Sequence, residues 1–82
     1  MGKYDKLRDK IMSGQADANI EFAELCHLLR KFGFDEEIKG SHHTFRKLGV
    51  VDNPNLQCIG AKAKSYQVRQ IRLLLMRYNL EF

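Results

Sequence analysis

The sequence predicts one α+β domain in which two helices cover one face of a three-stranded antiparallel sheet. Two segments, near residues 20–32 and 66–79, carry apolar side chains at the three-to-four-residue spacing of amphipathic helices. Between them lie three short segments of strand-like composition, separated by turns that contain glycine. The chain has 82 residues, 44% of them hydrophobic, so we expect one modest core and exclude a large multidomain enzyme.

An N-terminal extension is expected to precede this domain. Residues 1–18 form the extension and residues 19–82 the domain. Tyr4, Leu7 and Ile11 recur at helical spacing, which predicts a short amphipathic helix near residues 3–12. The Ser13-Gly14 pair that follows is expected to end this helix.

The first domain helix is expected over residues 20–32. Asn19 is a good N-cap, and Gly33 stands where a left-handed C-cap residue is needed. The apolar stripe of this helix consists of Phe22, Leu25, Leu29 and Phe32.

Strands are expected at 34–39, 41–48 and 56–59. Gly40 separates the first two, and a turn region that ends in Asn53-Pro54 separates the last two.

The second domain helix is expected over residues 66–79, after Ser65 as its cap. Its apolar stripe consists of Val68, Ile71, Leu75 and Tyr78. Arg69 and Arg72 lie on a different face of the helix from that stripe.

The net charge of +4 is unevenly distributed along the chain. Residues 20–38 hold five acids and two bases, whereas residues 39–82 hold eight bases and two acids. A basic second half favours a polyanionic partner on one side of the molecule, or it is simply a solvated basic surface. The sequence contains neither an apolar run of the ~20 residues that a membrane span needs nor a signal-peptide pattern, so we expect a cytoplasmic protein without membrane contact.

Metal and cofactor sites are not expected. Cys26 and Cys58 are 32 positions apart, a spacing unlike a paired metal motif, and both are expected to be buried free thiols. A metal site would have to pair His42 or His43 with His27 or Cys26. Adjacent strand histidines point to opposite faces of a sheet and cannot easily share an ion. His27 lies off the apolar stripe and is expected at the surface.

The segment from Gly40 to Phe45, with the sequence GSHHTF, carries the most informative chemistry. Strand alternation puts His43 on the face of Phe45, toward the helices. It puts His42 on the open face with Thr44 and Arg46. By periodicity alone, two ordinary histidines in a hairpin are the favoured explanation.

An exposed histidine beside cations suits acid–base cleavage of RNA. Histidine titrates near neutral pH, and RNA supplies its own nucleophile in the 2′-hydroxyl. Such a reaction needs a base, an acid and cations for the developing charge, and it requires no metal. A glycine such as Gly40 lets a phosphate approach the backbone closely.

Residues 28–45, LLRKFGFDEEIKGSHHTF, resemble the HicA family of toxins from bacterial toxin–antitoxin pairs. The resemblance rests on a helix that ends in Gly33-Phe34, then a strand, then Gly40-Ser41-His42 and, three residues on, Phe45. It extends over about residues 20–80. It implies a double-stranded-RNA-binding-domain-like α-β-β-β-α fold, ribosome-independent mRNA cleavage and a HicB-like antitoxin as partner.

The resemblance also implies which residue is catalytic. The histidine of the family motif corresponds to His42, and His43 is the second choice because some members have their histidine one place later. Many members carry Pro-x-His in the third strand, whereas residues 57–62 here read QCIGAK. Residues 1–18 are an addition to the family pattern. We expect them to contact the antitoxin or a second copy of the chain in a homodimer.

The leading hypothesis is therefore a metal-independent mRNA interferase that uses His42 as general acid or base. The residues expected to bind RNA phosphates are Lys39, Gly40, Ser41, Arg46, Lys62, Lys64, Arg69 and Arg72. One alternative is a non-catalytic RNA-binding module on the same fold. Another is a protein without an RNA role whose basic face docks an acidic antitoxin.

Overall fold

The computed structural model describes residues 2–58 and 60–80, which form three α-helices, one 3₁₀ turn and three strands. In chain order these elements are α1 (Lys3–Ser13), η1 (Asp17–Asn19), α2 (Phe22–Lys31), β1 (Asp35–Lys39), β2 (His42–Arg46), β3 (Asn55–Gln57) and α3 (Ser65–Tyr78). None of the helices in these residues combines the length and the apolar character that crossing a membrane requires.

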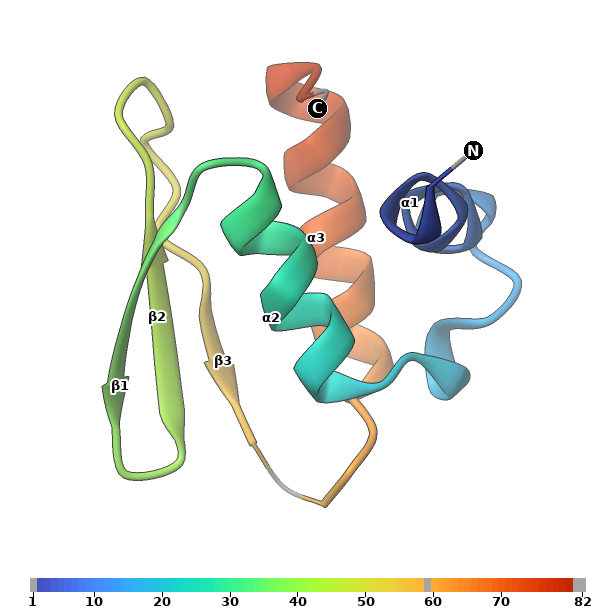
Figure 1. The fold of residues 1–82 in the computed structure, drawn as a ribbon, viewed down its shortest axis with the longest axis horizontal. Coiled ribbons are helices and arrows are strands. Elements are labelled where there is room, and N and C mark those ends of the chain that lie inside the picture. The colour runs from blue at the N-terminus through green and yellow to red at the C-terminus, as the bar shows by residue number, and fades with distance from the viewer. Residues whose placement is uncertain (1, 59, 81–82) are drawn as a thin grey trace.

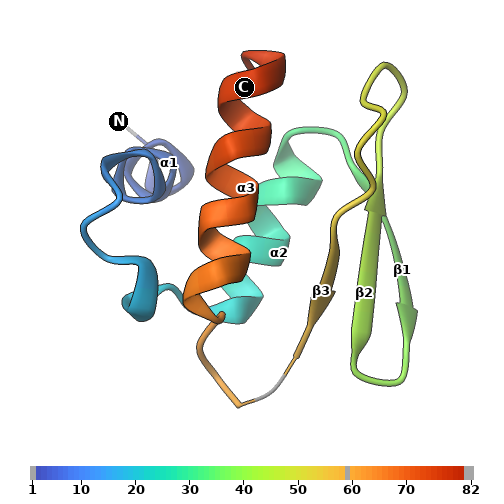
Figure 2. The ribbon, with the colours of Figure 1, turned by 180° about the vertical axis from the view of Figure 1, so that it is seen from behind.

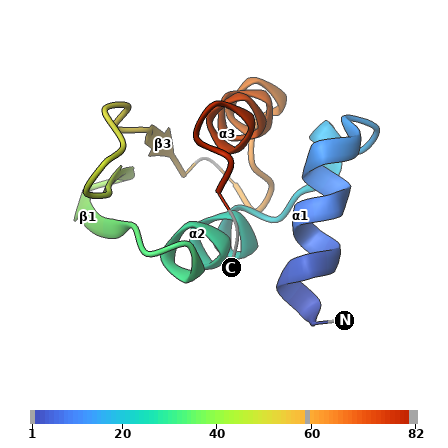
Figure 3. The ribbon, with the colours of Figure 1, turned by 90° about the horizontal axis from the view of Figure 1, so that it is seen from above.

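The elements form layers, with the sheet on one side of the molecule and α1 on the other (Figure 1). Helices α2 and α3 lie side by side between them, as the views from behind and from above also show (Figures 2 and 3). The sheet is antiparallel throughout, in the order β1-β2-β3. The α+β class with a three-stranded antiparallel sheet is thus confirmed.

The core lies between the helices and the sheet, because each layer contributes apolar side chains to it. Leu25 and Leu29 on α2 and Ile71 on α3 are buried, and so are Phe45 on β2 and Leu56 on β3. Burial of one such side chain contributes about 1.5–3 kcal/mol. The apolar stripes of both predicted helices therefore face the core, as expected.

Strand register decides which side chains reach the open face of the sheet. His43 is paired with Ile38 on one side and Leu56 on the other, and its face is the one that meets the helices. His42 is paired with Lys39 and Gln57 on the opposite face. The prediction that the two histidines diverge, His42 outward and His43 inward, is confirmed.

Helix α1 contributes to the same core as the rest of the chain. Leu7 and Ile11 are buried, and both belong to the hydrophobic cluster that includes the sheet residues. Gly14 ends the helix with φ of 73°, a left-handed conformation that glycine adopts without strain. The predicted helix and its stop at Ser13-Gly14 are confirmed.

The start of α2 differs from the prediction. Asn19 belongs to η1, and Glu21 is the residue that precedes the helix. The cause is a long-range pairing, in which the Phe22 amide donates to the Ala61 carbonyl and the Ala63 amide donates to the Ile20 carbonyl. This pairing keeps residues 20–21 extended, so the helix begins only at Phe22. The end is as predicted, since Gly33 follows with φ of 96°.

The boundaries of α3 and of the strands also differ from the predicted ones. Lys64, not Ser65, caps α3, because the Gln67 side chain accepts a hydrogen bond from the Lys64 amide. All three strands are shorter than expected, and Ile59, expected in the third strand, lies outside the described residues. Cys58 follows the end of β3 and is exposed, so the expectation that both thiols are buried is wrong for Cys58.

Candidate functional site

His42 begins β2 on the open face of the sheet, directly after the turn at Gly40-Ser41. The side chain is exposed, and within the described residues no hydrogen bond or ion pair engages it. Lys39 stands next to it across the β1–β2 pair, and Gln57 stands on its other side. His42 is therefore an accessible imidazole with one ammonium group as its neighbour in the sheet.

The turn before His42 depends on a glycine. Gly40 has φ of 60°, and a side chain added there would meet nothing within 4 Å. The glycine is needed for its left-handed backbone, and its surroundings are open to solvent. The open space leaves room for another molecule to approach the backbone at this turn.

The open face of the sheet carries both signs of charge. Lys39 Nζ lies 3.2 Å from Glu37 Oε1, and Arg46 stands opposite Asp35 in the strand register. The uneven charge along the sequence predicts a basic surface here, but the acidic side chains of Asp35 and Glu37 on β1 share this face. The open face as a whole is therefore not basic, and the positive charge beside His42 comes from Lys39.

Two further lysines lie at the same end of the molecule as His42. The Cys58 amide donates to the Ser41 carbonyl at 2.7 Å, so the chain that leaves β3 runs beside the turn. Lys62 and Lys64 follow in the segment that leads into α3, which Figure 1 shows at the same end as the β1–β2 turn. Both are exposed, and Lys62 Nζ lies 3.1 Å from Glu21 Oε1.

His43 occupies a different environment on the inner face. Its Nδ1 lies 2.8 Å from Glu36 Oε2, and its ring makes a T-shaped contact with the Phe22 ring at 5.1 Å between centroids. Arg30 forms an ion pair with the other oxygen of Glu36. Burial alone would raise the pKa of Glu36, but the hydrogen bond to His43 and the charge of Arg30 outweigh it and lower that pKa. Glu36 is therefore ionised, and its Oε2 accepts a hydrogen bond from the Nδ1–H group of His43.

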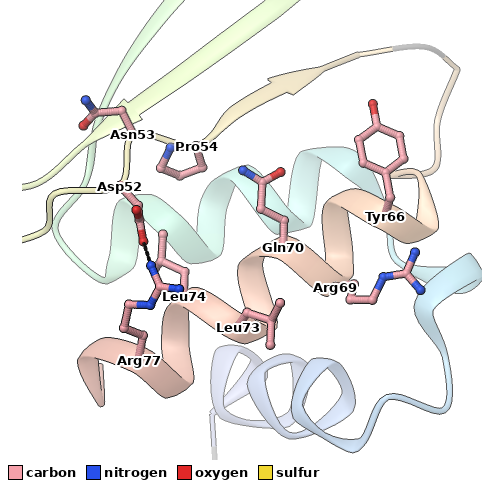
Figure 4. A pocket seen from close by; sticks show the side chains of 9 residues that line it. All are labelled: Asp52, Asn53, Pro54, Tyr66, Arg69, Gln70, Leu73, Leu74 and Arg77. Atoms are coloured by element: carbon pink, nitrogen blue, oxygen red, sulfur yellow. Dashed lines mark hydrogen bonds and ion pairs between the residues drawn. The ribbon is translucent and has the colours of Figure 1, made fainter.

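Arg72 and Arg69 are not near His42, because α3 lies on the other side of the sheet. Arg72 is bound to Asp17 and to the Ile11 carbonyl on the α1 side. Arg69 lines a groove of about 570 Å³ between α3 and residues 52–54, which precede β3 (Figure 4). The groove is also lined by Pro54, Tyr66, Leu73 and Arg77. The Arg77 guanidinium forms an ion pair with the Asp52 carboxylate at 2.9 Å.

The structure also brings together a cluster of potential metal ligands that was not predicted from the sequence. Cys26 on α2, Glu36 on β1 and His43 on β2 bring a thiol, a carboxylate and an imidazole within 4.8 Å of one another. A pairing of Cys26 with His43 is among the metal sites considered from the sequence, but Glu36 as a third ligand is not. Strand parity could have supplied it, since Glu36, His43 and Phe45 all share the inner face.

His27 is at the surface as expected, where its Nδ1 lies 3.3 Å from the Tyr4 hydroxyl.

Comparisons with protein-family models, with curated proteins and with solved structures found no match to this chain.

Proposed function

We propose that this chain binds RNA and cleaves it with His42, as the toxin of a HicA-like toxin–antitoxin pair. The observation that carries the proposal is the exposed His42 imidazole, free of partners within the described residues and next to Lys39 in the sheet. The order from α2 to α3 is helix, three strands, helix. It agrees with the double-stranded-RNA-binding-domain-like fold that the sequence resemblance implies.

The chemistry requires little of the protein because RNA carries the nucleophile. The 2′-oxygen attacks the adjacent phosphorus, the bond to the 5′-oxygen breaks, and a 2′,3′-cyclic phosphate and a 5′-hydroxyl form. His42 takes the 2′-hydroxyl proton or returns a proton to the leaving oxygen. Lys39 stabilises the negative charge that develops on the phosphate oxygens.

Phosphate binding is proposed for the end of the molecule around His42. Lys39, Lys62 and Lys64 supply the cations there, and the turn at Gly40-Ser41 offers backbone amides to a phosphate. Arg46 lies further along the same open face. Arg69, Arg72 and His43 are not part of the proposed site, because they lie on other faces of the molecule.

The reaction class is tested with three oligonucleotides of one sequence, as RNA, as 2′-O-methyl RNA and as DNA. Purified protein in EDTA should cleave only the RNA and leave a cyclic phosphate, which mass spectrometry identifies. Cleavage of all three strands would contradict the proposal, because the 2′-hydroxyl would then not be the nucleophile.

Non-catalytic RNA binding is the second candidate. The neighbour of His42 on β3 is Gln57, which cannot exchange a proton, so a partner for acid–base catalysis is missing on that strand. A gel shift that leaves the RNA intact, with affinity that falls steeply as salt rises, would favour binding alone.

The toxin role predicts an acidic HicB-like antitoxin as partner, encoded in a neighbouring reading frame. Expression of the chain alone should arrest bacterial growth, and expression of the His42→Ala variant should not. Arrest by both proteins would argue against a toxin that acts through His42.

A further inference from the structure

Three potential metal ligands from three elements converge between α2 and the sheet. They are the Cys26 thiol, the Glu36 carboxylate and the His43 imidazole, all within 4.8 Å of one another. Cys26 is 4% exposed, and the side chains of Glu36 and His43 are 11% and 17% exposed. The cluster is thus enclosed on the helix side and reaches solvent on the Glu36–His43 side.

We propose that Cys26, Glu36 and His43 bind one zinc ion that ties α2 to the β1–β2 hairpin. Thiolate sulfur and imidazole nitrogen favour zinc over magnesium or calcium, which prefer oxygen ligands. Three protein ligands leave the fourth tetrahedral position to a water molecule on the solvent side. The site is independent of the proposed RNA cleavage, because His42 points to the opposite face of the sheet.

The distances are close to those that a tetrahedral ion needs. Zinc bonds of about 2.0–2.3 Å place neighbouring ligand atoms roughly 3.3–3.7 Å apart. His43 Nδ1 and Glu36 Oε2 are 2.8 Å apart and the widest pair lies within 4.8 Å, so each must move by roughly 1 Å. Side-chain rotation can supply such a movement without a change in the backbone.

Zinc and Arg30 compete for Glu36. In the ion-free protein the Arg30 guanidinium pairs with one oxygen of Glu36, and His43 Nδ1 donates to the other. Zinc binding releases the Cys26 proton to solvent and leaves the His43 ring with its proton on Nε2. The Arg30 side chain is 40% exposed, so it can turn into solvent when the ion takes its place.

Cobalt titration tests the site because a thiolate–Co²⁺ bond gives charge-transfer absorbance and a tetrahedral ion gives visible bands. The wild-type protein should saturate at one Co²⁺ per chain, and one Zn²⁺ should remove the bands. Cys26→Ser should lose the charge-transfer band and His43→Ala should bind at least tenfold more weakly. The matched controls, Cys58→Ser and His42→Ala, should titrate like the wild type.

Arg30→Gln should strengthen cobalt binding, whereas the ligand variants weaken it. Removal of this cation should tighten Co²⁺ binding by on the order of tenfold, whereas Arg46→Gln on the open face should leave it unchanged. The absence of saturable cobalt bands in wild-type protein whose circular dichroism shows it folded would overturn the proposal. Bands that survive Cys26→Ser but vanish in Cys58→Ser would also overturn it.

Discussion

Arg72 on α3 holds Asp17 through two parallel hydrogen bonds, of 2.8 Å to Oδ1 and 3.1 Å to Oδ2. The same guanidinium donates to the Ile11 carbonyl at 3.1 Å, near the end of α1. The two side chains are only 16% and 19% exposed. The contacts of Arg72 with Asp17 and Ile11, which we call the clamp, link the N-terminal segment to α3. Residues 2–19 are therefore held by polar contacts as well as by apolar packing.

The clamp predicts a pH-dependent contribution of Asp17 to stability. The hydrogen bonds from Arg72 lower the pKa of Asp17 below its ordinary 3.8, against the opposing effect of burial. As the pH falls below about 3.8, the unfolded chain binds the proton first, so the contribution is present near neutrality and is lost in acid. Asp17→Asn should therefore lower the free energy of unfolding at pH 6, and the difference from wild type should shrink below pH 3.8.

Urea denaturation at a series of pH values measures this difference. Asp9→Asn is the matched control, because Asp9 is exposed on α1 and has no ion pair among the described residues. An Asp17→Asn deficit that stays constant from pH 6 to pH 3 would show that the carboxylate charge does not stabilise the fold.

Ile11 tests whether α1 belongs to the folded core. Its side chain is 0% exposed and belongs to the same cluster as Phe45, so Ile11→Ala should cost about 2–5 kcal/mol of unfolding free energy. Leu48→Ala, at a side chain that is 100% exposed, should change it by less than about 0.5 kcal/mol. Equal midpoints for the two variants in urea would mean that α1 is dispensable.

The two cysteines should react at very different rates. Burial raises the pKa of the Cys26 thiol to about 12, and the Glu36 carboxylate beside it adds to the rise, whereas Cys58 is exposed. With iodoacetamide and EDTA at pH 7.5, Cys58 should be alkylated on the order of 100-fold faster, as read from peptide masses. In concentrated urea both rates should become similar. Rapid alkylation of Cys26 in the folded protein would contradict the packing of α2 against the sheet.

Local patterns were sufficient to predict most of the fold. The apolar spacing of Leu25 and Leu29 predicted α2, and the glycine at position 33 predicted where it ends, because both signals act within one helix turn. Strand parity predicted that His42 and His43 face opposite sides. These features depend on neighbours in the chain, which the sequence shows directly.

Features that depend on distant residues could not be predicted. Asn19 is a good cap by composition, yet residues 20–22 pair with residues 61–63, and this pairing delays the start of α2. Arg72 lies off the apolar stripe of α3, which predicts a cation available to phosphate, but Asp17, 55 residues away, holds it on the α1 side. The association of Glu36 with Cys26 likewise needs the packing of a helix on a strand.

The central claim, that His42 cleaves RNA, is tested most directly by comparing single-turnover cleavage rates of wild type, His42→Ala and His27→Ala. His27 is the matched control because it is also an exposed histidine. General acid–base catalysis contributes about 10²–10⁴-fold, so His42→Ala should lose that factor while its circular dichroism stays unchanged. His27→Ala should cleave at the wild-type rate. A folded His42→Ala variant that cleaves as fast as wild type would contradict the account.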